Sequence, residues 1–525
     1  MTVKAHTEGA DPHRVTMAAP LPELAQGEQP QSVAAGRSRH LPPPAELVAH
    51  AAVLAALAVL VGPVAHSEGG RGPGAASWLA VATIAAIAGT RPWHRLTSRL
   101  WLLAPALALA AFYVVPATAG GRAASVAALS YATASGLLLA VAAYARTPRR
   151  RAAVAALLAA GGVAQFGWAL VPWWGGRDPS QPMVGTYYWH NQLAVALLLP
   201  ALLGAALAVA GRRPWRAAGW VAAPLCAAGV VLSTSRATTA SLLAGWVAVL
   251  AVSVAASSRR RPAAGRALAV TVAACALTFV LPGPPLFDTR VSPLAGATAR
   301  AAAGETVDAN TAYRTQFWRE AMSVTTHQPL TGAGYGRMAQ ASTPITPTSW
   351  AHSPLAHSGP LQAFADGGLP LGVSLLACLA VLAFALLRTL ATGLRAAIAP
   401  RRIDSTTTVA GGDAQHSPQV QGADAALAMA AAVAALALLA HSLVDIDWSY
   451  PALAGQFAVV AALALAPQHQ PRPAGSSQSS RSRRDVAAAG GSAVLALVLA
   501  LGAAAAWGQQ FHISAPQTAT GKAHT

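Results

Sequence analysis

The sequence contains little charge. Asp, Glu, Lys and Arg make up 10% of its 525 residues, whereas 54% are hydrophobic. A typical soluble domain carries about 25% charged residues, so a soluble globular protein is excluded. The apolar residues occur in blocks of about 15 to 25, and about 20 residues cross a hydrocarbon core as a helix. The alternating pattern of a membrane β-barrel is absent. The sequence therefore predicts an all-α, polytopic helical membrane protein.

Cysteine and lysine are also scarce. Cys226, Cys275 and Cys378 each lie inside an apolar block, and their spacing fits neither a disulfide framework nor a zinc site. Lysine occurs only at Lys4 and Lys522, so the net charge of +18 comes mainly from arginine. The arginines cluster between apolar blocks, as the positive-inside rule predicts for cytoplasmic loops. We therefore expect membrane lipid, and no nucleic acid, as the partner of these clusters.

The apolar blocks predict about 12 or 13 transmembrane helices. The predicted spans are Leu47–Ala65, Ala76–Gly89, Leu100–Ala117, Ala123–Ala145, Ala152–Val171, Leu193–Ala210, Ala217–Leu232, Thr238–Ala256, Ala267–Leu281, Leu369–Leu387, Ala425–Ala440, Pro451–Leu465 and Val486–Trp507. If the N-terminus is cytoplasmic, every dense arginine cluster falls on the cytoplasmic side. The prediction is thus a multi-pass protein of the cytoplasmic membrane.

These spans divide the chain into parts. The predicted parts are a disordered cytoplasmic tail at 1–44, N-terminal transmembrane helices at 45–281, a large extracytoplasmic loop at 282–368, C-terminal transmembrane helices at 369–507 with a cytoplasmic linker at 389–424, and an outer tail at 508–525. The large loop contains a short predicted helix, Asn310–Thr325, with Tyr313, Phe317 and Met322 on roughly one face. Long loops are usually functional, so we expect the site on the outer side.

Five motifs follow one another on that side. They are Asn191 before an apolar span, Leu232-Ser233-Thr234-Ser235-Arg236, Arg314 with Trp318, the turn Pro329–Gly336, and the stretch His357–Pro370. Together they resemble the O-antigen ligase superfamily, which includes ligases and polymerases, although Ser358 stands where the family usually has Asn. The resemblance covers about half the chain, Thr186–Tyr450. It implies transfer of a glycan from a polyprenyl-pyrophosphate carrier to an acceptor hydroxyl of a glycan or lipid, at the outer membrane face.

Such a transfer releases a pyrophosphate anion, which cations must neutralise. Arginine binds phosphate oxygens in pairs and stays charged. Arg236, at the outer end of a span, and Arg314 are therefore candidate catalytic residues, and Arg319 is a candidate for substrate binding. For each, the alternative is an interfacial anchor or an ion pair with Glu320 or Asp308.

The acceptor hydroxyl must lose a proton, and histidine is the usual base near neutral pH. His357 lies just before the chain re-enters the membrane and is the candidate base, with His352 as the second choice. Gln362 and Asp366 would lie near His357 on a helix and orient it. The alternative is a structural, hydrogen-bonded histidine.

Four further polar residues lie at predicted outer helix ends. His190 and Asn191 begin a span and are expected to line the same cavity. His441 and Asp445, four residues apart, are predicted to share a helix face, where ionisable groups are usually functional; the alternative is a His–Asp hydrogen bond that joins two helices. Asp445 and Asp447 resemble an Asp-x-Asp metal motif, but no ligand cluster accompanies them. We therefore expect a metal-independent reaction without a cofactor.

Three questions stay open at this point. The glycines of Pro329–Gly336 fit a tight turn, with a phosphate-binding nest as the alternative. Within the superfamily, a polymerase would join one carrier-linked oligosaccharide to another. A transporter or flippase for lipid-linked glycans is the alternative from a different class. Transporters place their polar groups at mid-membrane, whereas these candidates collect on the outer side, which favours an enzyme.

Overall fold

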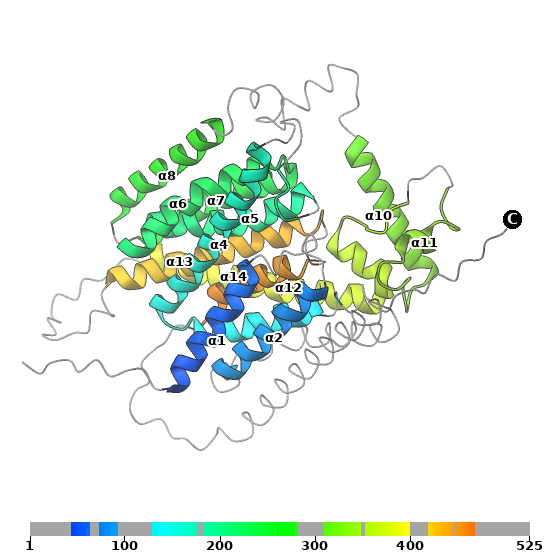
Figure 1. Ribbon diagram of the computed structural model, residues 1–525, viewed down its shortest axis with the longest axis horizontal. Coiled ribbons are helices and arrows are strands. Elements are labelled where there is room, and N and C mark those ends of the chain that lie inside the picture. The colour runs from blue at the N-terminus through cyan, green and yellow to red at the C-terminus, as the bar shows by residue number, and fades with distance from the viewer. Residues whose placement is uncertain are drawn as a thin grey trace, which may run out of the picture. The chain divides into compact units, whose positions relative to one another are not determined.

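The computed structural model describes residues 44–62, 73–92, 126, 129–175, 183–187, 189–257, 259–280, 309–347, 352–398, 418–445, 448 and 450–467, and all regular secondary structure within them is helical. The labelled helices in Figure 1 are α1 (Pro44–Val61), α2 (Pro73–Thr90), α4 (Pro148–Trp174), α5 (His190–Ala210), α6 (Arg213–Leu232), α7 (Arg236–Ala256), α8 (Arg260–Val280), α10 (Ala309–His327), α11 (Met338–Ser342), α12 (Gly359–Ile398), α13 (Pro418–His441) and α14 (Pro451–Leu465).

Eight described helices are long and apolar enough to cross a membrane: α1, α4, α5, α6, α7, α8, α12 and α13. Three shorter apolar helices accompany them, at Gly74–Thr90, Leu129–Tyr144 and Pro451–Leu465. The predicted all-α polytopic fold is therefore confirmed, and the protein is a multi-pass membrane protein. The predicted spans Leu100–Ala117 and Val486–Trp507 lie outside the described residues, as do the predicted tail at 508–525 and all of the predicted tail at 1–44 except Pro44, which begins α1.

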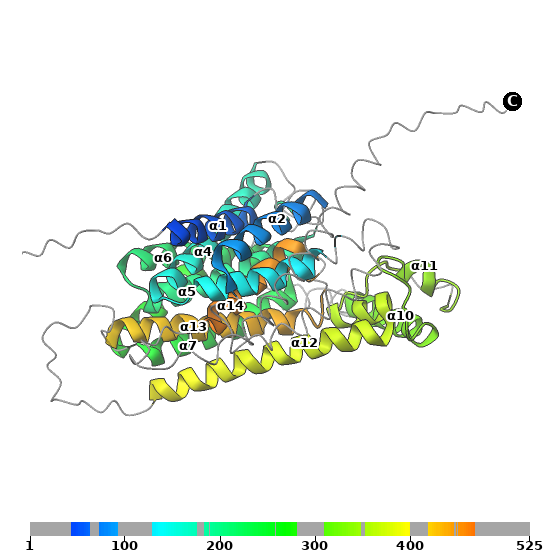
Figure 2. The ribbon, with the colours of Figure 1, turned by 90° about the horizontal axis from the view of Figure 1, so that it is seen from below.

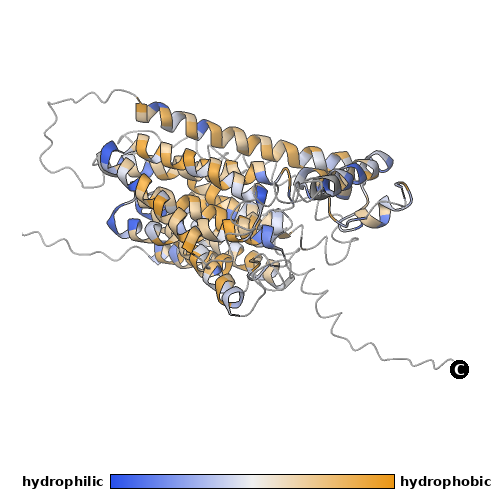
Figure 3. Cartoon of the chain, turned by 90° about the horizontal axis from the view of Figure 1, so that it is seen from above, coloured by the Kyte–Doolittle hydropathy of each residue, from blue (hydrophilic) through white to orange (hydrophobic). Residues whose placement is uncertain are grey.

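Helix α5 lies at the centre of the bundle. In its most apolar stretch of 18 residues, 94% of the residues are buried, because α4, α6, α7 and α13 pack around the helix. Small residues allow α5 and α6 to approach closely, since a Cβ atom on Gly204 would lie 2.8 Å from the backbone nitrogen of Ala223. Small residues are common at such membrane helix interfaces. Figure 3 shows hydrophobic residues throughout the bundle, with hydrophilic residues gathered near the helix ends.

The bundle has two chemically different ends. The first, called the site end here, is where α5 and α7 begin and where α6 and α13 end, and hydrogen bonds join these termini. The second, called the arginine-rich end, is where α4, α6, α8 and α13 begin. At this end, Arg151 contacts Asp424, and Arg266 Nε donates to Val209 O at 2.8 Å. A rise of 1.5 Å per residue places the ends of α5 about 30 Å apart.

Helix α12 is interrupted where the predicted span Leu369–Leu387 begins. Gly367 and Gly368 have non-helical backbone angles, and Gly368 has a φ of +66°, which favours glycine. A short helical segment, 359–366, therefore precedes the long helix and lies within the predicted loop 282–368. The long helix continues to Ile398, past the predicted start of the linker at 389, and α13 begins at Pro418; residues 399–417 are outside the described part.

The predicted outer loop at 282–368 contains the predicted short helix. It is present as α10, a little longer than the predicted Asn310–Thr325, and it packs against α11 and α12 (Figure 2). Tyr313 and Phe317 stack with ring centroids 6.4 Å apart, as their shared face predicts, whereas Met322 is exposed. Residues 281–308 lie outside the described part of the chain.

Candidate functional site

Asp445 is the central contact of the site end. It lies in the turn after α13, its side chain is 2% exposed, and its Oδ2 accepts a hydrogen bond from Asn191 Nδ2 at 3.2 Å. Arg314 Nη2 of α10 lies 3.9 Å from the same oxygen, and Arg314 Nη1 donates to the Val444 carbonyl. One buried carboxylate therefore joins α5, α10 and the α13–α14 turn. The alternative role for Arg314 was an ion pair with Glu320 or Asp308; among the described residues, its ion-pair partner is Asp445.

His441 joins the end of α13 to the start of α7. Its Nε2 lies 3.0 Å from Thr238 Oγ1, which lies 2.8 Å from Ser235 Oγ, and all three residues are buried. The prediction that His441 and Asp445 share a helix face is wrong, because α13 ends at His441 and Asp445 follows in a turn. The physical reason is that Gly359 N donates to Ser442 O at 2.9 Å, which holds the chain in a turn immediately after the helix.

His357 is brought to this cluster from the segment between α10 and α12. Its ring stacks on Phe317 of α10, with centroids 5.6 Å apart, and Phe317 lies one turn from Arg314. The backbone of His357 has a φ of +50°, a left-handed conformation that is uncommon for non-glycine residues. Two residues later, Gly359 makes the contact with Ser442, beside His441. The short connection places His357 near the α13–α14 turn.

Gln362 and Asp366 support the His357 segment through its backbone. Gln362 Nε2 donates to Asp366 Oδ1 at 2.9 Å, and Gln362 Oε1 accepts from the backbone N–H of Ala356 at 2.7 Å. Both side chains are buried. These side chains were expected to orient His357. In the structure, Gln362 instead binds the backbone N–H of Ala356, the residue that precedes His357.

The remaining candidate arginines are exposed. Arg236 is the first residue of α7, and Arg319 lies on α10; neither forms a hydrogen bond or ion pair with another described residue. Arg314 and Arg319 are five residues apart, which places them about 140° apart around a helix. Arg319 is thus not brought to Asp445 together with Arg314.

His190 lies beside the backbone of Ser233 and within electrostatic range of Asp445 and Arg314. The candidates His190, Asn191, Arg236, Arg314, His357, His441 and Asp445 therefore converge at the site end. His352 does not join them: its Nδ1 lies 3.3 Å from Glu320 Oε1 of α10 and 3.3 Å from Ser342 Oγ of α11.

Exposed tryptophans mark the same end of the bundle. Trp174, the last residue of α4, and Trp189, which precedes His190, are 60% and 62% exposed. Tryptophan is enriched at membrane–water interfaces. The two tryptophans are therefore consistent with a site end near a membrane–water interface.

Residues 221–376 match a family model described as O-Antigen ligase. This segment is a domain of the O-antigen ligase superfamily. It contains Arg236, Arg314, Arg319, His352, His357 and Gln362, whereas His190, Asn191, His441 and Asp445 lie outside it. The resemblance inferred from the five motifs is confirmed for this segment, which covers 221–376 of the 525 residues. No curated protein matches the chain.

Several residues of the site make contacts that the sequence does not predict. Thr238 begins an apolar span, and no local sequence signal indicates its contact with His441. Phe317 was assigned to a helix face, but its stacking on His357 was not foreseen. Ser235 has a sequence signal, because it lies in the same motif as Arg236. Thr234, in the same motif, has a φ of +59°.

Proposed function

We propose that the protein transfers a glycan from a polyprenyl-pyrophosphate carrier to an acceptor hydroxyl at the outer face of the cytoplasmic membrane, in cell-surface polysaccharide assembly. The observation that carries this proposal is Arg236. It is an exposed arginine without a described protein partner, beside a buried polar cluster, at the membrane interface of an O-antigen ligase domain. An unpaired guanidinium there suits the pyrophosphate of a lipid carrier.

The proposed step uses the residues in separate roles. The acceptor oxygen bonds to the anomeric carbon of the glycan while the bond from that carbon to the pyrophosphate oxygen breaks. His357 takes the acceptor proton, and the carrier pyrophosphate leaves as an anion bound by Arg236. Arg314 contributes a second positive charge, which Asp445 holds in place. His190 and Asn191 line the site, and exposed Arg319 is proposed to contact the substrate outside this cluster.

In the membrane-crossing helices α4, α7 and α13, the charged side chains lie near a helix end, as at Arg151, Arg236 and Asp424, and Asp445 lies just beyond the end of α13. This distribution favours an enzyme over a transporter, whose polar groups lie near the middle of broken helices. A transport assay in liposomes provides the check: movement of lipid-linked glycan without a new glycosidic bond would contradict the proposal.

Substitutions at Arg236 and His357 separate carrier binding from transfer. Arg236→Ala should weaken carrier binding and turnover, and Arg236→Lys should restore them only partly, because an ammonium lacks the planar fork. His357→Asn should leave carrier binding nearly intact and lower transfer by about 10²-fold. Asparagine is the better replacement here, since it tolerates a left-handed backbone.

The measurements are carrier binding and glycan transfer by purified full-length variants, with Arg261→Ala as the control. Arg261 is an exposed arginine at the arginine-rich end, so its loss changes the net charge without touching the site. Transfer at the unsubstituted rate by His357→Asn would remove the base assignment. The acceptor distinguishes the two family activities: a polymerase extends carrier-linked glycan into a ladder of products, whereas a ligase makes one product on a different acceptor.

A further inference from the structure

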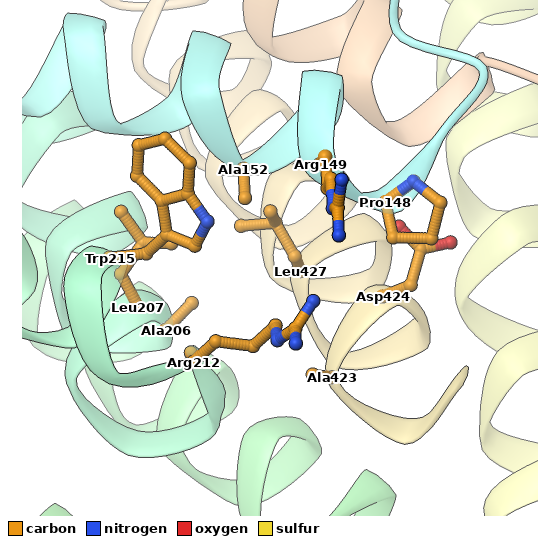
Figure 4. Close-up of a pocket in the computed structure, with 11 residues that line it drawn as sticks. Pro148, Arg149, Ala152, Ala206, Leu207, Arg212, Trp215, Ala423, Asp424 and Leu427 are labelled. Carbon is orange, nitrogen blue, oxygen red and sulfur yellow. The ribbon is translucent and has the colours of Figure 1, made fainter. Parts of the chain in front are cut away.

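A small pocket opens at the arginine-rich end, on the opposite side of the bundle from the candidate functional site. It lies between the start of α4, the end of α5, and the starts of α6 and α13. Figure 4 shows Arg149 and Arg212 directed into the same space, with Trp215 on one side and Asp424 on the other. Leu207 and Leu427 add apolar walls.

The two pocket arginines differ from their neighbours. Arg150, Arg216 and Arg266 are each engaged, with the Glu46 carboxylate, the Gly211 carbonyl and the Val209 carbonyl respectively. Arg149 and Arg212 are exposed and have no hydrogen bond or ion pair with another described residue. Both lie at helix N-termini, whose free N–H groups add positive potential. The pocket is therefore electropositive and available to an anion.

Asp424 provides a buried hydrogen-bond acceptor next to the two arginines. One of its oxygens, Oδ2, contacts Arg151, and Arg151 Nη2 also donates to Ala466 O at 3.1 Å. The other oxygen, Oδ1, is buried without a hydrogen-bond partner among the described residues, on a residue that is 7% exposed. A buried acceptor of this kind requires a donor. The complementary ligand has an anionic group for the arginines and a hydroxyl for Asp424.

We propose that this pocket binds the headgroup of an anionic glycerophospholipid of the phosphatidylglycerol class. Arg149 and Arg212 bind the phosphodiester, and a glycerol hydroxyl donates to Asp424 Oδ1. Trp215 lies at the lipid–water boundary, as interfacial tryptophans do, and Leu207 and Leu427 contact the first carbons of the lipid. Basic pockets between membrane helices bind anionic headgroups through the same chemistry. The proposal does not depend on the proposed glycan transfer.

The test compares lipid binding to two full-length variants with equal charge. Arg149→Gln/Arg212→Gln removes both pocket cations, and Arg213→Gln/Arg261→Gln removes two exposed arginines at the same end that do not line the pocket. Native mass spectrometry of detergent-purified protein titrated with phosphatidylglycerol measures binding. We expect the pocket variant to lose about tenfold or more in affinity, because charge-assisted hydrogen bonds are the strong ones. The control variant should bind as the original protein does.

Three further ligands test the headgroup specificity of the pocket. Phosphatidylcholine, and phosphatidylmethanol with its single charge and no headgroup hydroxyl, should each bind more weakly than phosphatidylglycerol. Inorganic phosphate should not displace the lipid. Equal losses in both variants would show only general attraction to the basic face, and displacement by phosphate would show a free-anion site; either result overturns the proposal. Equal binding of phosphatidylmethanol would overturn the role of Asp424.

Discussion

Substituting Gly332 tests whether the turn Pro329–Gly336 must pack tightly against the interruption in α12. Gly332 lies in this turn with a φ of +60°, and a Cβ atom there would lie 2.5 Å from both Asp366 C and Gly367 N. These are backbone atoms, and they are held in place, since Ala333 N donates to Ala365 O at 2.8 Å. Gly332→Ala must therefore push the turn away from the interruption in α12.

The expected magnitude follows from two contributions. A left-handed backbone costs an alanine about 1–2 kcal/mol, and overpacking a tight interior costs about 1–3 kcal/mol. Gly332→Ala should therefore destabilise the protein by roughly 2–5 kcal/mol. Gly334→Ala is the matched control: its φ is +84°, but the nearest atom to its Cβ would be Arg337 Cδ, at 3.7 Å. Only the backbone cost of about 1–2 kcal/mol remains there.

The assay is the thermal unfolding midpoint of each purified variant, followed by glycan transfer below that midpoint. Gly332→Ala should lower the midpoint clearly more than Gly334→Ala, and it should lower transfer because the segment that carries His357 follows the turn. Equal midpoints would refute the steric argument. A loss of carrier binding in both variants, with unfolding unchanged, would instead support the phosphate-nest alternative.

The remaining predictions concern topology, metal dependence and the buried ion pair. In a cysteine-free background, an impermeant thiol reagent should label exposed Gln340→Cys in intact cells but not exposed Thr392→Cys, because the arginine-rich end should be cytoplasmic; the reverse pattern would invert the orientation. Transfer should survive EDTA, and loss restored by Mg²⁺ or Mn²⁺ would contradict a metal-independent reaction. Asp424→Asn should destabilise the protein by about 3–5 kcal/mol, because it leaves the 1% exposed Arg151 side chain uncompensated. Replacing both with Arg151→Met/Asp424→Leu should be nearly neutral in unfolding measurements, and equal losses in the single and double variants would argue against this pairing.

The helical framework could be predicted well because its signals are local. The span Pro451–Leu465 has the predicted bounds, since a proline begins the apolar run and the run ends before Pro467. The start of the span at Leu369 was predictable because Gly367-Gly368 precedes it, and the structure interrupts α12 at those glycines.

The contacts within the site could not be predicted because they are distant in sequence. Asn191 and Asp445 are 254 residues apart, and no local pattern pairs a polar residue at one helix end with another beyond several spans. The end of α13 shows the same limit. The segment after His441 contains no glycine or proline before Tyr450, so the spacing favoured a continued helix, and the tertiary contact between Gly359 and Ser442 ends it instead.

Two residues of the candidate site have left-handed backbone conformations, and residues outside the family match make contacts next to both. Thr234 and His357, with φ values of +59° and +50°, are two of the three described non-glycine residues with positive φ. Such residues cost about 1–3 kcal/mol each and persist where surrounding contacts hold them. Here those contacts come through His441, which binds the α7 terminus beside Thr234, and through Ser442, which binds Gly359 beside His357. His441 and Ser442 lie outside residues 221–376, so the strained geometry of the O-antigen ligase domain depends on helices beyond the domain itself.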